Sequence, residues 1–576
     1  MRLVLAQFLR TLKERDEFDR LLPDLLLSMG YVTLTRPQTG VRQHGVDLAV
    51  FGTSQEDNQP ELLLFVIKRG DIGRRDWDNP EPTCVRTSLN EVLDVYLNKY
   101  ISPEHNSIRK KIIVSTTGDM KQDVEPNWIS FKETNSEKAI IDFWGGDKVA
   151  SLIVRHMLNE NLFTADDRTD LRKALAVAGE NEYDYRDLNR LLLRQLGLSK
   201  TGSLIDGTIA ITALAKALKR AHLAAQICAS WAREERDTRQ ALWVNERALL
   251  WSWHRVMLVS ELERKSLYPI ITDMWRSYFQ ASGDYLMAIS PYLQVGDGMT
   301  GYCSEGAELG IVVFEHIGML STIGLAFLLE QAPDSEREYR GKCITVIAND
   351  LCALIKNNSC AGSPPLDSHV TDIQIGLLFL CAAGRHDEAK AWLTSLVERL
   401  NFCFLSKRGF PVGTDRLEDL VELIAGESEN EEFCDSLMST SWCLAVFAAW
   451  CAVLEMHDQY KLLADNHAAS YSNVCAQLWH PSIGWSKQWY FGGATEEGDT
   501  EAPYTLPKDI GILIDRMQLF LRNPQYDWDA NSPAKMAGKW IFDFIACRHF
   551  RMPVPASVLY KSLPNAVDIS ESPAVP

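Results

Sequence analysis

The chain has 576 residues, of which 46% are hydrophobic and 24% are charged, and its formal net charge is −18. This composition is typical of a soluble globular protein, and the length predicts two to four domains. Residues 1–150 carry 20 basic and 23 acidic side chains, whereas the rest of the chain carries 39 and 54. Because an acidic surface repels phosphate, we expect any contact with nucleic acid in the N-terminal part or at a local basic patch.

The thirteen cysteines are scattered along the chain and form no CxxC pair. That pattern indicates reduced, buried thiols rather than a disulfide framework or a zinc site. The apolar stretch at the N-terminus is too short and too rich in charge for a secretory signal. We therefore expect a cytoplasmic protein.

Up to about residue 160 the chain alternates between helical and strand-like patterns. In chain order these patterns predict a helix over 16–29, strands over 31–35, 45–52 and 61–68, a helix over 85–99, strands over 111–115, 128–132 and 140–144, and a helix over 148–159. Strands interleaved with helices predict an α/β domain, in which a sheet is covered by helices.

From about residue 165 onwards the pattern is almost entirely helical. Helices are predicted over 171–178, 188–196, 209–231, 242–262, 373–380 and 384–400. No fixed 34-residue period is present, so we expect an irregular α-solenoid or a bundle rather than a regular repeat array. With a break at Ser363–Asp367, the predicted division is 1–160, then a helical domain in two parts, 161–362 and 363–576.

Two apolar segments, 310–329 and 436–454, are long enough to cross a membrane. The first carries Glu315 and His316, and both segments lie among amphipathic helices without a basic flank. We interpret them as buried core helices. The alternative that they leave open is a membrane-associated protein.

The spacing that carries chemistry is an acid on the first helix, Glu17, then Asp47 near the start of one strand and Lys68 at the end of the next. If the two strands pair as a hairpin, Asp47 and Lys68 meet at one end of the sheet. A carboxylate there can hold Mg²⁺, a hard ion that prefers oxygen ligands and bridges to phosphate. The lysine can steady the attacking water or the charge that develops on phosphorus.

At this point the sequence resembles the PD-(D/E)xK, restriction-endonuclease-like superfamily, and in particular its Mrr-like branch. The resemblance lies in EFDRLLPDLLLSMGY, GVDLAVF and LLLFVIKRG, and IIDFWGGDKVASLI is similar to the closing strand and helix of such domains. Matched position by position, Glu17 corresponds to the helix acid, Asp47 to the metal-binding aspartate and Lys68 to the catalytic lysine. The resemblance covers about a quarter of the chain. It implies a central mixed sheet flanked by helices, and hydrolysis of DNA that depends on Mg²⁺ or Mn²⁺.

One position departs from the family pattern, because Val66 stands two residues before Lys68, where the family has Glu, Asp or Gln. A valine side chain cannot bind a metal. Three interpretations follow. The site works with fewer ligands, using Asp47 and the backbone carbonyl of Ile67; a carboxylate has moved to the next helix, where Glu91 is the candidate; or the domain is an inactive nuclease retained for binding.

Basic residues follow the strand that ends at Lys68, and Arg69, Arg74 and Arg75 are candidates for neutralising the phosphates of a nucleic acid. Residues 109–111 form a second basic cluster. Acidic residues between the arginines weaken the first signal, so a solvated loop is the alternative. Trp77 in the same loop either stacks on a base or packs in the core.

By its resemblance, this arrangement is similar to bacterial defence effectors that degrade phage or plasmid DNA. DNA is then the substrate, and the acidic helical domain is suited to a protein partner or a small-molecule activator that regulates cleavage. The competing hypothesis is a catalytically inactive scaffold that binds nucleic acid or protein, which Val66 favours. The aromatic-rich stretch 478–493 forms either a ligand pocket or core packing, and the sequence leaves the oligomeric state open.

Overall fold

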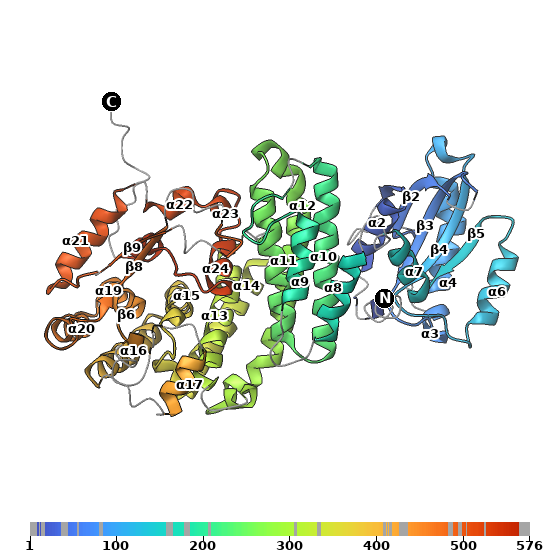
Figure 1. Cartoon of the computed structure of the whole chain (residues 1–576). Coiled ribbons are helices and arrows are strands. Elements are labelled where there is room, and N and C mark those ends of the chain that lie inside the picture. The colour runs from blue at the N-terminus through green and yellow to red at the C-terminus, as the bar shows by residue number, and fades with distance from the viewer. Residues whose placement is uncertain are drawn as a thin grey trace. The chain divides into compact units, whose positions relative to one another are not determined.

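The computed structural model describes residues 9–10, 12, 18–35, 44–54, 57–79, 84–156, 165–177, 185–205, 209–303, 308–330, 336–406, 411, 413, 417–425, 436–481, 488–492, 498–502, 504–523 and 526–563. The chain forms two compact units, which are considered separately below (Figure 1). The first comprises Met1–Arg194 with Leu223–Asp237, and the second comprises Gln195–His222 with Thr238–Pro576. The predicted division at residue 363 falls inside the second unit.

The first unit contains a five-stranded mixed sheet, in which the strands lie side by side in the order in which they occur in the sequence. The strands are β1 (Val32–Thr35), β2 (Leu48–Thr53), β3 (Pro60–Lys68), β4 (Arg109–Thr116) and β5 (Ile140–Trp144). The pairs β1–β2 and β2–β3 are antiparallel, whereas β3, β4 and β5 run parallel to one another. In the middle strand every residue from Glu61 to Ile67 is buried, so both faces of the sheet are covered.

Helices connect and cover these strands, as the sequence predicts for an α/β domain. They are α2 (Asp19–Ser28), α3 (Arg74–Trp77), α4 (Val85–Glu91) with its continuation through η2 (Val92–Tyr96) and α5 (Leu97–Lys99), α6 (Glu125–Thr134) and α7 (Gly146–His156), with a short η3 (Pro103–His105). Residues of α3, α4 and α6 pack in one hydrophobic cluster with Leu64 and Val66 of β3. The next part of this unit is helical, with α8 (Ala165–Ala176) and α9 (Arg186–Leu196).

One predicted strand is wrong, because residues 128–132 lie within the helix α6. The helix begins at Glu125 with a proline directly after it, a position where the missing N–H of proline costs nothing. Its aromatic residues are spaced three apart, and both Trp128 and Phe131 pack edge-on against the ring of Trp77. Packing at helical spacing, and not the short apolar run, determines the conformation of this segment.

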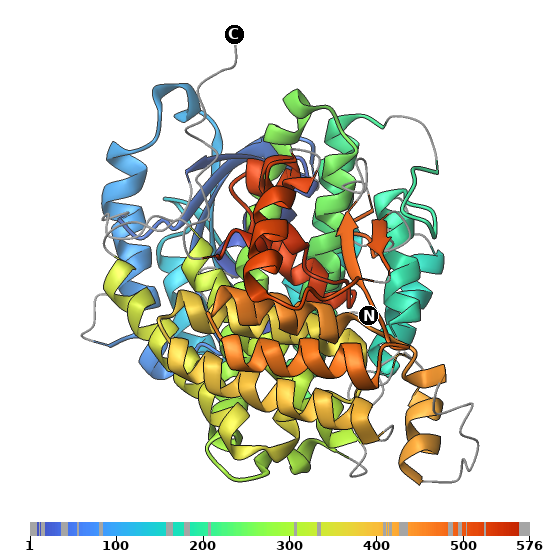
Figure 2. The same ribbon diagram turned by 90° about the vertical axis from the view of Figure 1, so that its left-hand side faces the viewer.

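The second unit is mostly helical. Its helices are α11 (Thr238–Met257), α12 (Glu261–Leu293), α13 (Glu308–Leu329), α14 (Arg337–Asn357), α15 (Val370–Ala382), α16 (His386–Ser406), α17 (Leu417–Ala425), α19 (Trp442–Val453), α20 (His457–Ser470), α21 (Ile510–Leu521), α22 (Trp528–Asn531), α23 (Pro533–Met536), α24 (Ile541–His549) and α25 (Ala556–Tyr560), while α10 (Ile211–Glu234) is shared between the two units. Short 3-10 turns are η4 (Gly298–Tyr302), η6 (Ser359–Gly362) and η7 (Asp367–His369). Figure 2 shows the yellow and orange helices of this unit lying side by side.

Two small sheets complete the second unit. The strands β6 (Thr440–Ser441) and β7 (Cys475–Ala476) are parallel, and β8 (Leu478–Pro481) and β9 (Gly498–Glu501) form an antiparallel pair. The segment that begins at residue 478, which the sequence analysis singled out for its aromatic residues, therefore starts in a strand.

The two long apolar segments both form buried helices. In the described part of the chain, α13 is the one helix long and apolar enough to cross a membrane, and 78% of its most apolar window is buried in the fold. It packs against α14, α15 and α24. The second segment contains the shorter helix α19, whose residues Cys443–Val453 are buried. These contacts agree with the interpretation of both segments as core helices.

Candidate active site

The candidate site lies where β2 begins and β3 ends. Leu48 pairs with Phe65 in the antiparallel register, and the backbone N–H of Asp47 donates to the Phe65 carbonyl over 2.9 Å. The Oδ2 atom of Asp47 accepts the backbone N–H of Ile67 over 2.7 Å. The carboxylate is therefore held against the backbone of β3, one residue before Lys68.

Lys68 is the last residue of β3 and is half-buried. In the parallel register with β4 its partner is Thr116. The predicted hairpin of β2 and β3 is present, and it brings Asp47 and Lys68 to the same end of the sheet. Asp47 is therefore hydrogen-bonded to Ile67, the β3 residue that directly precedes Lys68.

Val66 occupies the position where the PD-(D/E)xK pattern has a metal ligand, and its side chain belongs to the core. Only 1% of it is exposed, and it packs in the cluster that includes Leu64, Val114 and Leu89. Because side chains alternate along a strand, Val66 and Lys68 point to the same face. At this position the face is apolar, so any further carboxylate ligand has to come from outside β3.

The helix α4 packs against the turn that precedes β2. The turn before β2 contains Gly45, whose φ is +80°, and a Cβ on it would lie 2.2 Å from the Ser88 carbonyl oxygen and 3.0 Å from Val92 Cγ2. The helix therefore packs directly against the backbone two residues before Asp47. Glu91 is three residues after Ser88, which places it on the same side of the helix, and it is half-buried.

Two of the predicted metal-site features are not established by these contacts. Glu17 lies outside the described residues. Among the residues that the structure describes, no group of three or more His, Cys, Asp or Glu side chains is arranged to hold a metal ion. The ligands expected from the sequence are fewer than that, namely the carboxylates of Asp47 and Glu91 with the backbone carbonyl of Ile67.

Loops after β3 and β4 are tied together beside Lys68. The Gly70 N–H donates to the Thr117 hydroxyl over 2.9 Å, and the Asp119 N–H donates to a carboxylate oxygen of Asp71 over 3.0 Å. These bonds fix the backbone that follows the lysine. This network was not predicted from the sequence, although a Gly-Asp pair follows each of the three parallel strands. The pairs are Gly70–Asp71, Gly118–Asp119 and Gly146–Asp147.

The basic residues after β3 are exposed, as a contact with nucleic acid requires. Arg69, Arg74 and Arg75 all lie on the surface of the first unit. Trp77, by contrast, is only 2% exposed, and its ring lies 6.0 Å from that of Trp128. The tryptophan therefore packs in the core, and a stacking contact with a base is excluded for it in this conformation.

The second basic cluster is engaged in contacts within the first unit. Arg109 forms ion pairs with Asp57 and with the buried Glu61, and Lys111 lies 3.3 Å from Asp142. Hydrogen bonding from Arg109 lowers the pKa of Asp57 to about 2. These side chains form ion pairs within the first unit, so they are poor candidates for phosphate contacts.

The chain matches no family model, and no curated protein or solved structure matches it either. The resemblance to the PD-(D/E)xK superfamily therefore rests on the residues quoted above and on the placement of those that the structure describes.

Proposed function

We propose that the first unit is a metal-dependent phosphodiesterase that cleaves DNA, with Asp47 as a ligand of the cation and Lys68 as the catalytic lysine. The observation that carries this proposal is the 2.7 Å bond from the Ile67 N–H to the Asp47 carboxylate, which holds that carboxylate one residue from Lys68. The mixed sheet flanked by helices is the architecture that the PD-(D/E)xK resemblance implies, and it supports the same reading.

The donor set suits a hard divalent cation. Asp47 and Glu91 supply carboxylate oxygens and Ile67 a backbone carbonyl, which are the ligand types that Mg²⁺ and Mn²⁺ use in proteins. A carboxylate that accepts one hydrogen bond still has acceptor capacity for a cation. When bound, such an ion polarises a phosphoryl oxygen and lowers the pKa of a bound water.

The residues of the chain supply positioning and charge. The ammonium group of Lys68 donates to a phosphate oxygen and stabilises the negative charge that grows there in the transition state. The bonded loops after β3 and β4 keep the backbone around the lysine in place. The exposed Arg69, Arg74 and Arg75 neutralise neighbouring phosphates along the nucleic acid, which contributes affinity but no sequence preference.

The proposal is tested by incubating the purified chain with plasmid and linear DNA, with and without Mg²⁺ or Mn²⁺. We expect cleavage that requires the ion and falls by about 100-fold or more in Asp47→Ala and in Lys68→Ala. Lys138→Ala is a matched control, because this lysine is exposed and its contact with Asp94 is a surface pair of little energy. Cleavage that survives both site substitutions contradicts the assignment.

A second candidate function is favoured by the burial of Val66. With an apolar residue at the position of a ligand, the first unit would be a non-catalytic scaffold that binds nucleic acid or a protein. A gel-shift assay separates the two functions. DNA binding by the wild-type chain that is weakened by Arg74→Gln and Arg75→Gln, without cleavage under either ion, favours the scaffold.

The wider role that we propose is defence of a bacterial cytoplasm against phage or plasmid DNA, with cleavage regulated by a protein partner or small molecule that binds the helical unit. The test is the number of phage plaques on bacteria that express the chain. We expect fewer plaques with the wild type than with Lys68→Ala at equal protein levels. Equal numbers for the two would contradict a nuclease-dependent role in defence against the phages used.

A further inference from the structure

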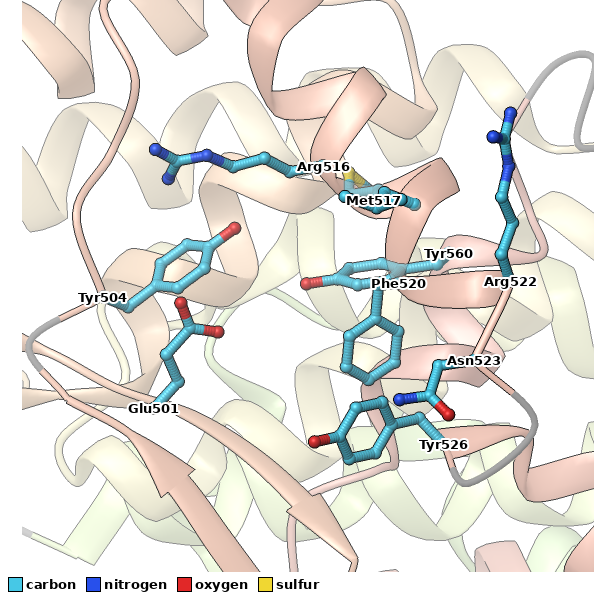
Figure 3. A pocket seen from close by; sticks show the side chains of 10 residues that line it. Glu501, Tyr504, Arg516, Met517, Phe520, Arg522, Asn523, Tyr526 and Tyr560 are labelled. Carbon is cyan, nitrogen blue, oxygen red and sulfur yellow. The ribbon is translucent and has the colours of Figure 1, made fainter.

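A pocket of about 650 Å³ opens in the second unit between β9, α21 and α25. Its volume lies within the range of sites for small organic ligands. Figure 3 shows two sides facing each other across it, one formed by Tyr504 and Glu501 and the other by Phe520, Tyr526 and Tyr560. All of these residues belong to the second unit, so the pocket is independent of the nuclease site.

One side of the pocket is an aromatic platform. The rings of Phe520 and Tyr526 are stacked, with centroids 4.6 Å apart and an angle of 9° between their planes. Tyr560 meets Phe520 edge-on at 5.3 Å, and His480 of β8 lies 4.6 Å from the Phe520 ring and supports the platform. Flat, partly exposed aromatic surfaces of this kind bind the faces of planar rings.

Charged groups of both signs border the same pocket. In Figure 3 the Glu501 carboxylate lies beside Tyr504, the Arg516 side chain extends above that ring, and Arg522 stands at the opposite edge. Arg516 donates to the Thr505 carbonyl over 3.0 Å, which fixes its direction and uses one of its five N–H donors. An acceptor for N–H groups, an aromatic platform and two guanidinium groups therefore border one cavity.

We propose that this pocket binds a purine nucleoside phosphate, with guanine preferred. The base stacks on an outer face of the Phe520–Tyr526 pair, because the inner faces of these two rings contact each other. Glu501 accepts the two adjacent N–H groups that guanine presents on its Watson–Crick edge. Adenine presents only one such donor there. Arg522, at the opposite edge from Glu501, binds the phosphate, which is the group that a guanidinium recognises best through paired N–H donors.

The charge of the pocket argues for this ligand over an organic cation. An aromatic cage with one carboxylate attracts ammonium groups. Here, however, two guanidinium groups oppose one carboxylate, so a cation is repelled where a phosphate is attracted. Desolvation raises the pKa of the buried Tyr504 to about 12, so its hydroxyl is neutral and does not repel a phosphate.

The experiment is isothermal titration of the full-length chain with guanosine monophosphate, and then with adenosine monophosphate, guanosine and inorganic phosphate. We expect the tightest binding for guanosine monophosphate, weaker binding for the adenine nucleotide and for guanosine, and none for phosphate alone. A wild-type chain that is folded and binds no nucleotide overturns the proposal. So does tighter binding of choline than of guanosine monophosphate, which would indicate a cation site.

Three variants separate the contributions to binding. Phe520→Leu is expected to weaken the binding of guanosine monophosphate by roughly tenfold or more, because the stacking contact is lost. Glu501→Gln should remove the preference for guanine over adenine. Arg522→Gln should weaken the binding of guanosine monophosphate and leave the binding of guanosine unchanged. Arg276→Gln is the control, because this arginine of α12 is exposed and pairs within its own helix. Unchanged nucleotide affinity in both Phe520→Leu and Arg522→Gln overturns the assignment of the ligand to this pocket.

Discussion

The two units of this protein keep their charged residues in different surroundings. In the first unit, the candidate site stands at the end of a sheet, with Lys68 half-buried and Arg69 exposed to solvent. In the second unit, Glu246 of α11 is fully buried against Arg548 and His549 of α24. Charges at a sheet end are available to a solute, whereas charges between helices have to be satisfied by one another.

In the buried cluster of the second unit, the charged and polar side chains form hydrogen bonds with one another. Glu246 accepts from the guanidinium of Arg548 and lies 3.0 Å from Nδ1 of His549. Nε2 of His549 accepts from Arg247 over 2.8 Å, so the proton of the imidazole stands on Nδ1 and points to Glu246. Burial lowers the pKa of His549 to about 4, which keeps this ring neutral at neutral pH. The cluster therefore links α11 to α24 by contacts that no solute can replace.

The largest effect is expected from removing the buried negative charge. Glu246→Gln leaves the Arg548 guanidinium buried without its counter-charge, which should destabilise the fold by about 3–5 kcal/mol. Urea unfolding followed by circular dichroism measures this change. Glu338→Gln is the control, because its pair with Lys342 is exposed and should be worth less than about 1 kcal/mol. If the two variants lose similar amounts of stability, burial does not make the Glu246–Arg548 pair more important than the exposed Glu338–Lys342 pair.

A pH-dependent effect is expected from Asp372 of α15, because burial raises the pKa of this carboxyl from 3.8 to about 7. The folded protein therefore holds a proton that the unfolded chain releases, so the stability from this group is present below about pH 4 and is lost as the pH rises towards 7. Asp372→Asn should gain stability relative to the wild type over that range, on the order of 1 kcal/mol per pH unit. Unfolding curves at pH 4, 5.5 and 7 measure it, and a difference independent of pH contradicts it.

A smaller loss of stability is expected from a substitution where α13 and α15 approach closely. A Cβ on Gly318 would lie 1.9 Å from a carboxylate oxygen of Asp372, so Gly318→Ala should cost about 1–3 kcal/mol in thermal unfolding. Gly283→Ala on α12 is the matched control, because nothing lies within 4 Å of its Cβ position. There, alanine should stabilise the helix by up to about 1 kcal/mol. The same sign for both variants would contradict the packing described for α13.

The smallest effect concerns the first unit, away from its candidate site. The Tyr31 hydroxyl donates to Glu61 over 2.6 Å, and Arg109 donates to the same carboxylate over 2.8 Å. Because Arg109 remains as a partner in Tyr31→Phe, the loss should be only about 1 kcal/mol, and DNA cleavage should be unchanged. Cleavage assays beside urea unfolding test this separation. A large loss of cleavage without a loss of stability would connect this end of β3 to the chemistry.

Local patterns in the sequence were sufficient for most elements of the first unit. The strands around Asp47 and Lys68 were predicted because apolar runs are bounded by turn residues, and the hairpin then determines that the two meet. The uninterrupted apolar run that contains Val66 already indicates a strand buried on both faces. The error at 128–132 arose because a short run cannot distinguish a strand from a helix that packs aromatic residues three apart.

Contacts between distant residues could not be predicted in this way. Glu246 and Arg548 are separated by 302 residues, and nothing near either indicates its partner. The stretch 478–493 was recognised as aromatic, but its His480 packs against Phe520. Phe520 lines a pocket between β9, α21 and α25. Which of the polar residues meet depends on how the helices pack, and a single sequence does not contain that information in its local spacing.

The bond from the Ile67 N–H to Asp47 has a consequence for measurement. This amide is a reporter placed inside the candidate site, because its proton senses the same carboxylate that would bind a cation. A cation that draws electron density from Asp47 weakens the bond, so the Ile67 amide resonance should move upfield and its hydrogen should exchange faster with solvent. If the proposed site binds a cation, the Ile67 amide reports its occupancy, and this can be followed in the absence of DNA and without any cleavage.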